Sequence, residues 1–263
     1  MHDLSILQIT DLHIMPSIDD TFQGISTEYY FNAIVDLAYT ENDHFDLILV
    51  TGDLAQDPCK ASYQRILQRL EATNTTSIFL PGNHDDYQLM QQVFSTDKMS
   101  CRKKVIFKNW QLICLNSQIP DSPSGRLSKQ ELFFLEDCLI EKPNLFTLIA
   151  VHHHCLPTGM AWMDNMIIEN NKEFLMKIKQ YPQIKAVTCG HIHQELDIKI
   201  EGLSIFGTPS TCFQFTPKSE TFSLDTTAPG YRIIKLHPDG RIDTKIKRLP
   251  EPIIGLQMNT HGY

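Results

Sequence analysis

The sequence predicts an α/β fold in which two packed mixed β-sheets are flanked by helices. Five short apolar runs rich in Ile, Leu and Val are typical of strands buried on both faces. Segments with apolar residues at helical spacing lie between the early strands and are expected to cover a sheet. After Gly190 the pattern changes to short strands with hairpin signals, which predicts a second, more antiparallel sheet packed on the first.

Each of the five predicted strands ends at a short polar cluster. The runs LSILQI, DLILVT, TSIFLP, LFTLIAV and IKAVTC precede, in that order, Asp11-x-His13, Gly52-Asp53, Gly82-Asn83-His84-Asp85, His152-His153-His154 and Gly190-His191-x-His193. The carboxyl ends of strands form the ligand-binding edge of an open α/β sheet, so the clusters are expected to converge in one site. Gly52 and Gly82 allow sharp turns at that edge.

Three helices are predicted from spacing and capping signals. Apolar residues recur at helical spacing from Ser26 to Glu41 and from Cys59 to Asn74. Ser128 followed by Glu131 is a capping box, which predicts a helix running to about Ile140.

Two hairpin turns are predicted near the C-terminal end, at Glu201-Gly202 and Asp239-Gly240. The chain has no low-complexity linker and no internal repeat. Residues 1–263 are therefore predicted to form a single domain, with 250–263 as a C-terminal tail.

The polar clusters contain the donor groups of a two-metal site. Imidazole nitrogen with carboxylate or amide oxygen suits divalent first-row metals such as iron, manganese, cobalt or zinc. Asp53 is the natural candidate for a carboxylate that bridges two cations through its two oxygens. Taken singly, an Asp-x-His motif often occurs by chance, and Gly-Asp or Asn-His-Asp usually marks a turn or a helix cap. Their joint occurrence, each after a strand, predicts metal binding.

Three segments leave alternatives open. Alternation along an extended chain puts His152 and His154 on the same side, so the residues alone do not choose a ligand among the three histidines. The Met- and Trp-containing segment from Leu156 to Asn170 is either ordinary core or a cap that stacks on a nucleobase or makes a subunit contact. The loop from Gly207 to Thr216 is either a polar turn or a group of donors to a ribose or base.

Composition narrows the class of protein. Lys plus Arg is 23 and Asp plus Glu is 31, giving a formal charge of −8, which argues against nucleic-acid binding but not against a small anion at a metal site. Seven scattered cysteines without a C-x-x-C pair indicate reduced thiols rather than a disulfide framework. Neither a signal-peptide pattern nor an apolar stretch of roughly 20 residues is found, so a cytoplasmic protein without membrane association is expected.

The order of the five clusters resembles that of the calcineurin-like metallophosphoesterases and spans residues 11–193. The longer strings ILQITDLH, FDLILVTGDLAQD, LPGNHD, HHHCLPTGMAWMD, CGHIHQELD, GTPSTCFQFTP and LDTTAPGYR are similar to those of the class III bacterial 3′,5′-cyclic-AMP phosphodiesterases. The resemblance implies a four-layer α/β/β/α sandwich and hydrolysis of cyclic AMP to 5′-AMP. Cys155 departs from the family, which usually carries proline after the third histidine.

The resemblance also implies a role for each polar residue. One metal is expected to be held by Asp11, His13, Asp53 and His193, and a second by Asp53, Asn83, His152 and His191, with Fe²⁺ or Mn²⁺ as the expected ions. His84 is expected to remain unligated beside the substrate phosphate as a catalytic group. Asp85 either orients the His84 ring or is the first-turn acid of the next helix. The residues expected to contact substrate are His13, Asp53, Asn83, His84 and His193.

The implied reaction is in-line attack on the phosphodiester by a hydroxide that bridges the two metals. The carboxylates of Asp11 and Asp53, the hydroxide and a phosphodiester monoanion formally balance two divalent cations. His84 is expected to protonate the departing oxygen or donate a hydrogen bond to it. The expected partner is a small-molecule cyclic nucleotide, and a homo-oligomer is left open.

Two alternatives to this function are considered. The same site is able to act on another phosphodiester or phosphomonoester. A non-catalytic interaction module on this fold is disfavoured, because it would be expected to have lost ligands or His84, and every such position is filled here.

Overall fold

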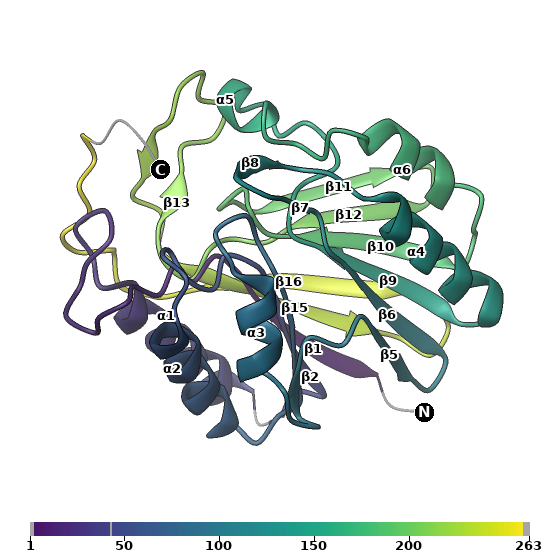
Figure 1. Cartoon of the computed structure of the whole chain (residues 1–263), viewed down its shortest axis with the longest axis horizontal. Helices are drawn as coiled ribbons and strands as arrows, with labels where there is room; N and C mark the ends of the chain where they lie inside the picture. Colours follow the sequence, from purple (N-terminus) through teal and green to yellow (C-terminus); the bar gives the residue numbers. More distant parts are fainter. Residues whose placement is uncertain (1–2, 43, 260–263) are drawn as a thin grey trace.

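Two six-stranded mixed sheets lie between two groups of helices (Figure 1). The computed structural model describes residues 3–42 and 44–259. In spatial order the first sheet comprises β16 (Ile242–Arg248), β15 (Gly230–Leu236), β1 (Leu4–Ile9), β2 (Leu47–Thr51), β3 (Ser77–Leu80) and β4 (Met99–Ser100). The second comprises β11 (Leu196–Ile200), β12 (Leu203–Gly207), β10 (Ile184–Cys189), β9 (Phe146–Val151), β6 (Trp110–Leu115) and β5 (Lys104–Phe107).

Helices cover the outer face of each sheet. They are α1 (Thr27–Glu41), α2 (Lys60–Glu71), α3 (Tyr87–Val93), α4 (Lys129–Glu141), α5 (Ala161–Asp164) and α6 (Asn171–Ile178). The first three pack on the first sheet, and α4 and α6 pack on the second (Figure 1). Two short hairpins, β7 (Gln118–Ile119) with β8 (Ser122–Gly125) and β13 (Gln214–Phe215) with β14 (Leu224–Asp225), stand apart from the sheets. The predicted four layers are confirmed.

Strand alternation divides the apolar residues among three cores. On β1, Leu4 and Ile6 face the second sheet, whereas Leu7 and Ile9 face the helices. The same division holds on the second sheet, where Leu112 joins the core between the sheets and Ile113 joins the core under α4. Both faces of these strands are buried, as the continuous apolar runs predict.

The strands are shared between the sheets differently from the prediction. The second sheet was expected to form after Gly190 and to be more antiparallel, but it contains β6, β9 and β10, and its inner pairs are parallel. The hairpin β15–β16 instead extends the first sheet through antiparallel pairing of β15 with β1. An apolar run indicates burial on both faces but does not specify which sheet receives the strand. Both predicted hairpin turns are present.

The predicted helix starts are confirmed, with one difference in capping. The hydroxyl of Ser26 accepts a hydrogen bond from Tyr29 N at the start of α1, and Cys59 and Ser62 cap α2 reciprocally. The hydroxyl of Ser128 accepts from Glu131 N at the start of α4. The carboxylate of Glu131, however, accepts from Asn116 N and Lys103 Nζ rather than completing the capping box, because it ties α4 to the loop after β6.

The predicted C-terminal tail lies against the N-terminal part of the chain. Residues 250–259 contain no helix or strand, and the rest of the tail lies outside the described residues. Ile254 N donates to the Tyr30 hydroxyl at 2.8 Å, and Gln257 N donates to Gln23 O at 2.9 Å. Over the described ranges, none of the helices has the length and apolar character to cross a membrane.

Candidate metal centre

The seven predicted metal ligands come together where the carboxyl ends of the two sheets meet. Strands β1, β2 and β3 deliver their loops from the first sheet, and β9 and β10 deliver theirs from the second. Hydrogen bonds join the loops across the two sheets: His191 N donates to the Asp11 carboxylate at 3.0 Å, and His152 Nδ1 donates to Thr51 O at 2.8 Å. Within the second sheet, Gly190 N donates to His152 O at 3.1 Å. The convergence predicted for one sheet edge is therefore achieved between two sheets.

Five of the seven have a left-handed backbone, which is uncommon for residues other than glycine. Their φ angles are 53° at Asp11, 47° at His13, 51° at Asp53, 68° at His191 and 45° at His193. This conformation costs roughly 1 kcal/mol or more at each position and persists only where the surrounding structure imposes it. The loops are thus held in strained turns that direct several side chains into one small volume.

The predicted ligands of the first metal form a compact buried group. Nε2 of His13 lies 3.3 Å from Nε2 of His193, which lies 3.6 Å from Asp11 Oδ1. Asp53 Oδ2 completes the group at 3.9 Å from His13 Nε2. All four side chains are fully buried. Donor atoms so close together in a fully buried group fit a cation held at their centre.

A second group forms on the other side of Asp53. Nε2 of His152 lies 3.3 Å from Asp53 Oδ2 and 3.2 Å from Asn83 Oδ1. The same carboxylate oxygen therefore faces both groups, while Asp53 Oδ1 accepts a hydrogen bond from His84 N at 3.0 Å. Asp53 was expected to bridge through both oxygens; instead one oxygen faces the two groups and the other holds the turn that carries His84.

Backbone and amide oxygens fix the orientation of three of the histidine rings. Each Nδ1 donates at 2.8 Å to an oxygen that only accepts: His13 to Gln56 Oε1, His152 to Thr51 O, and His193 to Phe213 O. The proton is thereby placed on Nδ1, and the Nε2 lone pair is directed into the site, as metal-binding histidines require. Within the described residues neither ring nitrogen of buried His191 has a hydrogen-bond partner, which also fits a metal ligand.

Three of the four predicted histidine ligands are held in the neutral form that binds metal, whereas the Asp53 carboxylate outweighs burial and raises the pKa of His152 to about 9. Burial lowers the pKa of His13 to about 3, and it holds the pKa values of His191 and His193 well below their usual range. Neutral imidazole is the ligand form of histidine, so burial prepares these rings for a cation.

The two carboxylates respond differently to the same surroundings. Burial, together with the neighbouring charge of Asp53, raises the pKa of Asp11 to about 8. Burial would also raise the pKa of Asp53, but His152 and other nearby histidines outweigh it and hold that pKa well below its usual range. Both carboxylates need positive charge to stay ionised in this buried place, and divalent cations would add to the charge that His152 supplies.

His84 lies beside the two ligand groups, and Asp85 does not orient its ring. The His84 ring packs edge-on against His13 at 5.2 Å between centroids, and its Nδ1 contacts Gln56 O at 3.3 Å. The Asp85 carboxylate points away, accepting from Gly82 N at 2.9 Å, from the Tyr63 hydroxyl at 2.9 Å and from the backbone of 54–55. Nor is Asp85 a first-turn acid of the next helix, since α3 begins at Tyr87 and its N-cap is Asp86. Its contacts are those of a residue that fixes the loop.

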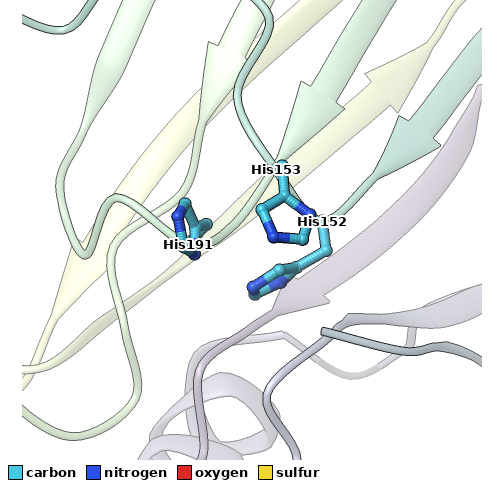
Figure 2. A group of neighbouring side chains, drawn as sticks. All are labelled: His152, His153 and His191. Carbon is cyan, nitrogen blue, oxygen red and sulfur yellow. The ribbon is translucent and has the colours of Figure 1, made fainter. Parts of the chain in front are cut away.

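The other two consecutive histidines are also buried beside the site. Figure 2 shows the rings of His152, His153 and His191 gathered beyond the strand ends, with the last two 4.6 Å apart between centroids. Nδ1 of His153 hydrogen-bonds the Ser117 hydroxyl at 2.7 Å. His154 lies with its Nε2 at 3.6 Å from Asp164 Oδ1. The donor atoms of the three labelled histidines lie within 4.8 Å of one another.

An open cavity of about 440 Å³ adjoins Asn83 and His84. Its other walls are formed by Asp121, Ser122, Pro123, Trp162, Met166 and Phe222. The Met- and Trp-containing segment thus divides: Met160 and Met163 are fully buried in a core, whereas Trp162 and Met166 line the cavity.

The loop from Gly207 to Thr216 packs against the first metal group. Ser210 donates its hydroxyl hydrogen to Asp11 O at 2.7 Å, and Phe213 O accepts from His193. These contacts support ligand loops rather than present donors to a ribose. Cys155, at the position where the family usually has proline, is buried in the core under the second sheet, and burial raises the pKa of its thiol to about 12.

A family comparison identifies the class of protein. The model of the calcineurin-like phosphoesterases matches residues 4–195, so the chain belongs to this family of hydrolases. The family implies divalent metal ions, which agrees with the clustered donors.

Several named relatives match over almost their full length. The chain is 37% identical to a 3′,5′-cyclic adenosine monophosphate phosphodiesterase CpdA of Vibrio vulnificus, covering 100% of this chain and 96% of the relative. It is 38% identical to the protein of the same name in Escherichia coli K12, covering 98% and 94%. A 3′,5′-cyclic-nucleotide phosphodiesterase of Nostoc is 39% identical, covering 94% and 93%.

Solved structures share the fold at low identity. A dimetal phosphatase from Danio rerio has a TM-score of 0.63 at 13% identity, covering 93% of this chain and 98% of that chain. A purple acid phosphatase from yellow lupin seeds has a TM-score of 0.66 at 13% identity, covering 94% of this chain and 52% of that one.

Proposed function

We propose that this protein hydrolyses 3′,5′-cyclic AMP to 5′-AMP at a two-metal centre. The observation that carries the proposal is the full-length similarity, at 37 to 38% identity, to relatives named for this activity. Asp11, His13, Asp53 and His193 would hold one ion, and Asp53, Asn83, His152 and His191 the other, with Fe²⁺ or Mn²⁺ as the proposed ions. When bound, two such cations lower the pKa of water and stabilise charge on phosphoryl oxygens.

The cavity beside His84 supports a nucleotide substrate. It opens directly at Asn83 and His84, so a phosphodiester at the metals would place its nucleoside next to Trp162 and Phe222. Aromatic walls suit a purine base, because base–aromatic stacking contributes about 1–3 kcal/mol. Its volume of about 440 Å³ is within the range of small-molecule sites.

His84 is the group on this chain that we assign to the leaving oxygen. Its backbone is fixed by Asp53, and its ring stands at the junction of the metal groups and the cavity. From there it would protonate the 3′-oxygen as the P–O bond breaks, leaving 5′-AMP as product. The side chains of His13, Asp53, Asn83 and His193 would lie nearest the phosphate.

Product analysis tests the proposal. Purified protein supplied with Mn²⁺ or Fe²⁺ should convert cyclic AMP to 5′-AMP, and removal of the metal by a chelator should stop the reaction. Formation of 3′-AMP would contradict the assignment of the leaving oxygen. If the metal-loaded protein hydrolyses a different phosphoester in the same panel but not cyclic AMP, the alternative function, hydrolysis of another phosphoester, replaces this one.

A further inference from the structure

The side chain of Gln118 holds the turn that carries Asn83 and His84 through two hydrogen bonds. The amide Nε2 of Gln118 lies 2.6 Å from Gly82 O and 2.7 Å from Asp85 O. Both partners are carbonyl oxygens, which only accept, so the nitrogen donates both hydrogen bonds. A single side chain therefore joins the two ends of the four-residue turn.

The turn from Gly82 to Asp85 is also closed by three other hydrogen bonds. Asp85 N donates to Gly82 O at 3.2 Å, Gly82 N donates to the Asp85 carboxylate at 2.9 Å, and His84 N donates to Asp53 Oδ1 at 3.0 Å. A Cβ atom at Gly82 would lie 2.1 Å from Asp53 Oδ1, so the glycine is needed for this approach. Gly82 O thus accepts from both Asp85 N and Gln118 Nε2, and the same Gln118 nitrogen also donates to Asp85 O.

Gln118 belongs to the hairpin that also forms a wall of the cavity. It pairs with Gly125 in the β7–β8 ladder, and its backbone N–H donates to Asn116 Oδ1 at 2.8 Å. Residues 121–123 at the tip of the same hairpin line the cavity together with Asn83 and His84. The hairpin that lines the cavity therefore also carries the side chain that holds the His84 turn.

We propose that Gln118 is a positioning residue that holds His84 at the angle required to protonate the leaving group. The proposal rests on the proposed phosphodiesterase function. Gln118 contributes no metal ligand and no proton, and it acts through the backbone of the His84 turn. A misplacement of about 1 Å in such a group can cost roughly 10²-fold in rate.

Two substitutions of similar size separate the hydrogen bonds from the packing. Gln118→Met keeps the length but removes both donors, and Gln118→Glu places a carboxylate against two carbonyl oxygens. We expect both variants to keep two metals and a cooperative melt, and to lose roughly 10- to 100-fold in kcat on cyclic AMP, with KM changed less than about threefold. Gln180→Met, at an exposed position just after α6, is the control and should be unchanged.

A double-mutant cycle shows whether Gln118 acts through His84. If it does, adding Gln118→Met to His84→Ala should cost less than about threefold, because the group being positioned is already absent. Losses that multiply in the double variant would overturn the proposal, as would wild-type kcat in both single variants. Loss of metals or of cooperative melting in both variants would also overturn it, because Gln118 would then support only the fold.

Failure of the proposed function gives a different result. If the wild-type protein does not hydrolyse cyclic AMP, that function fails whatever Gln118 does. The same double-mutant cycle is then measured on an alkyl phosphodiester that the protein does hydrolyse. The cycle requires only a substrate with a poor leaving group, because such a group needs the proton that His84 is proposed to donate.

Discussion

At the scale of single residues, Asp53 connects every part of the site. Its Oδ2 lies 3.3 Å from His152 Nε2 and 3.9 Å from His13 Nε2, so it faces both ligand groups. Its Oδ1 holds the backbone of His84. One carboxylate thus faces both predicted ligand groups and fixes the place of the proposed proton donor.

We therefore predict that Asp53→Ala loses both metals. Elemental analysis of the purified variant should find close to none, against about two per chain in the wild type. Asp53→Asn keeps an oxygen for His84 N but removes the charge, so it should bind metal more weakly than the wild type while retaining the turn. Asp137→Ala, an exposed acid on α4, is the control. Full metal occupancy in Asp53→Ala would contradict the bridging role.

His84→Ala should separate proton donation from metal binding. We expect the variant to keep its metals but lose roughly 10² to 10⁴ in rate on cyclic AMP, the usual scale for one general acid. A nitrophenyl phosphodiester has a stable leaving group and should be affected much less. His44→Ala, which removes an exposed histidine, serves as the control. Equal losses on both substrates would mean that His84 holds the phosphate instead.

The sequence identified the residues that bear chemistry better than the residues that hold them. The ligand motifs follow apolar strands and are visible in the printed sequence. The contacts of Gln56, Gln118 and Ser210 are not visible in the sequence, because their hydrogen-bond partners lie 43, 36 and 199 positions away along the chain. Gln56 falls within the string GDLAQD, but nothing local shows that its side chain orients His13. The role of Asp85 was misjudged for the same reason.

At the scale of elements, the short helix α5 brings Trp162 to the cavity. Its indole N–H donates to the Ser219 hydroxyl at 3.1 Å, and its ring packs edge-on against Phe222. The wall is thus fixed before substrate binds, and a base would meet a rigid aromatic surface.

Trp162→Ala should raise KM for cyclic AMP by roughly tenfold or more, corresponding to a stacking contribution of about 1–3 kcal/mol. Steady-state kinetics should show kcat changed much less, and Trp162→Phe should restore most of the affinity. Phe133→Ala, which removes an exposed ring on α4, controls for loss of an aromatic side chain. An unchanged KM in Trp162→Ala would place the base elsewhere.

Element boundaries were predictable, but the pairing of strands was not. Apolar alternation and caps located β1, β2, α1 and α4 within a few residues. Assignment of β9 and β10 to the second sheet depends on α4 and α6, which cover its outer face and need a sheet of their own. No local pattern in either strand carries that information, because both sheets bury their strands on two faces.

At the scale of the whole molecule, the two sheets meet at a strained and buried polar centre. Left-handed backbone at five ligand positions and the burial of Asp11 and Asp53 both oppose folding. Cations that bind only the folded state would offset this cost, each by about 4 kcal/mol when the free metal exceeds Kd a thousandfold.

Chelation should accordingly lower the melting temperature by roughly 16 °C or more, since two cations would together contribute about 8 kcal/mol and about 1 kcal/mol corresponds to some 2–4 °C for a chain of this size. Differential scanning calorimetry with and without chelator measures the shift. Asp53→Ala, which is predicted to lack metals already, should melt at the same temperature in both conditions. A wild-type melt that is indifferent to chelator would show that the centre forms without help from metal.

A phosphodiester monoanion would bring the charge of the proposed two-metal centre to zero. A phosphomonoester brings an additional negative charge, so it should react more slowly at the same metals. The most direct test is kcat/KM of the metal-loaded protein for cyclic AMP and for 5′-AMP under identical conditions. We predict at least roughly a hundredfold preference for cyclic AMP, equivalent to about 2.8 kcal/mol. Comparable values for the two substrates would contradict the central claim.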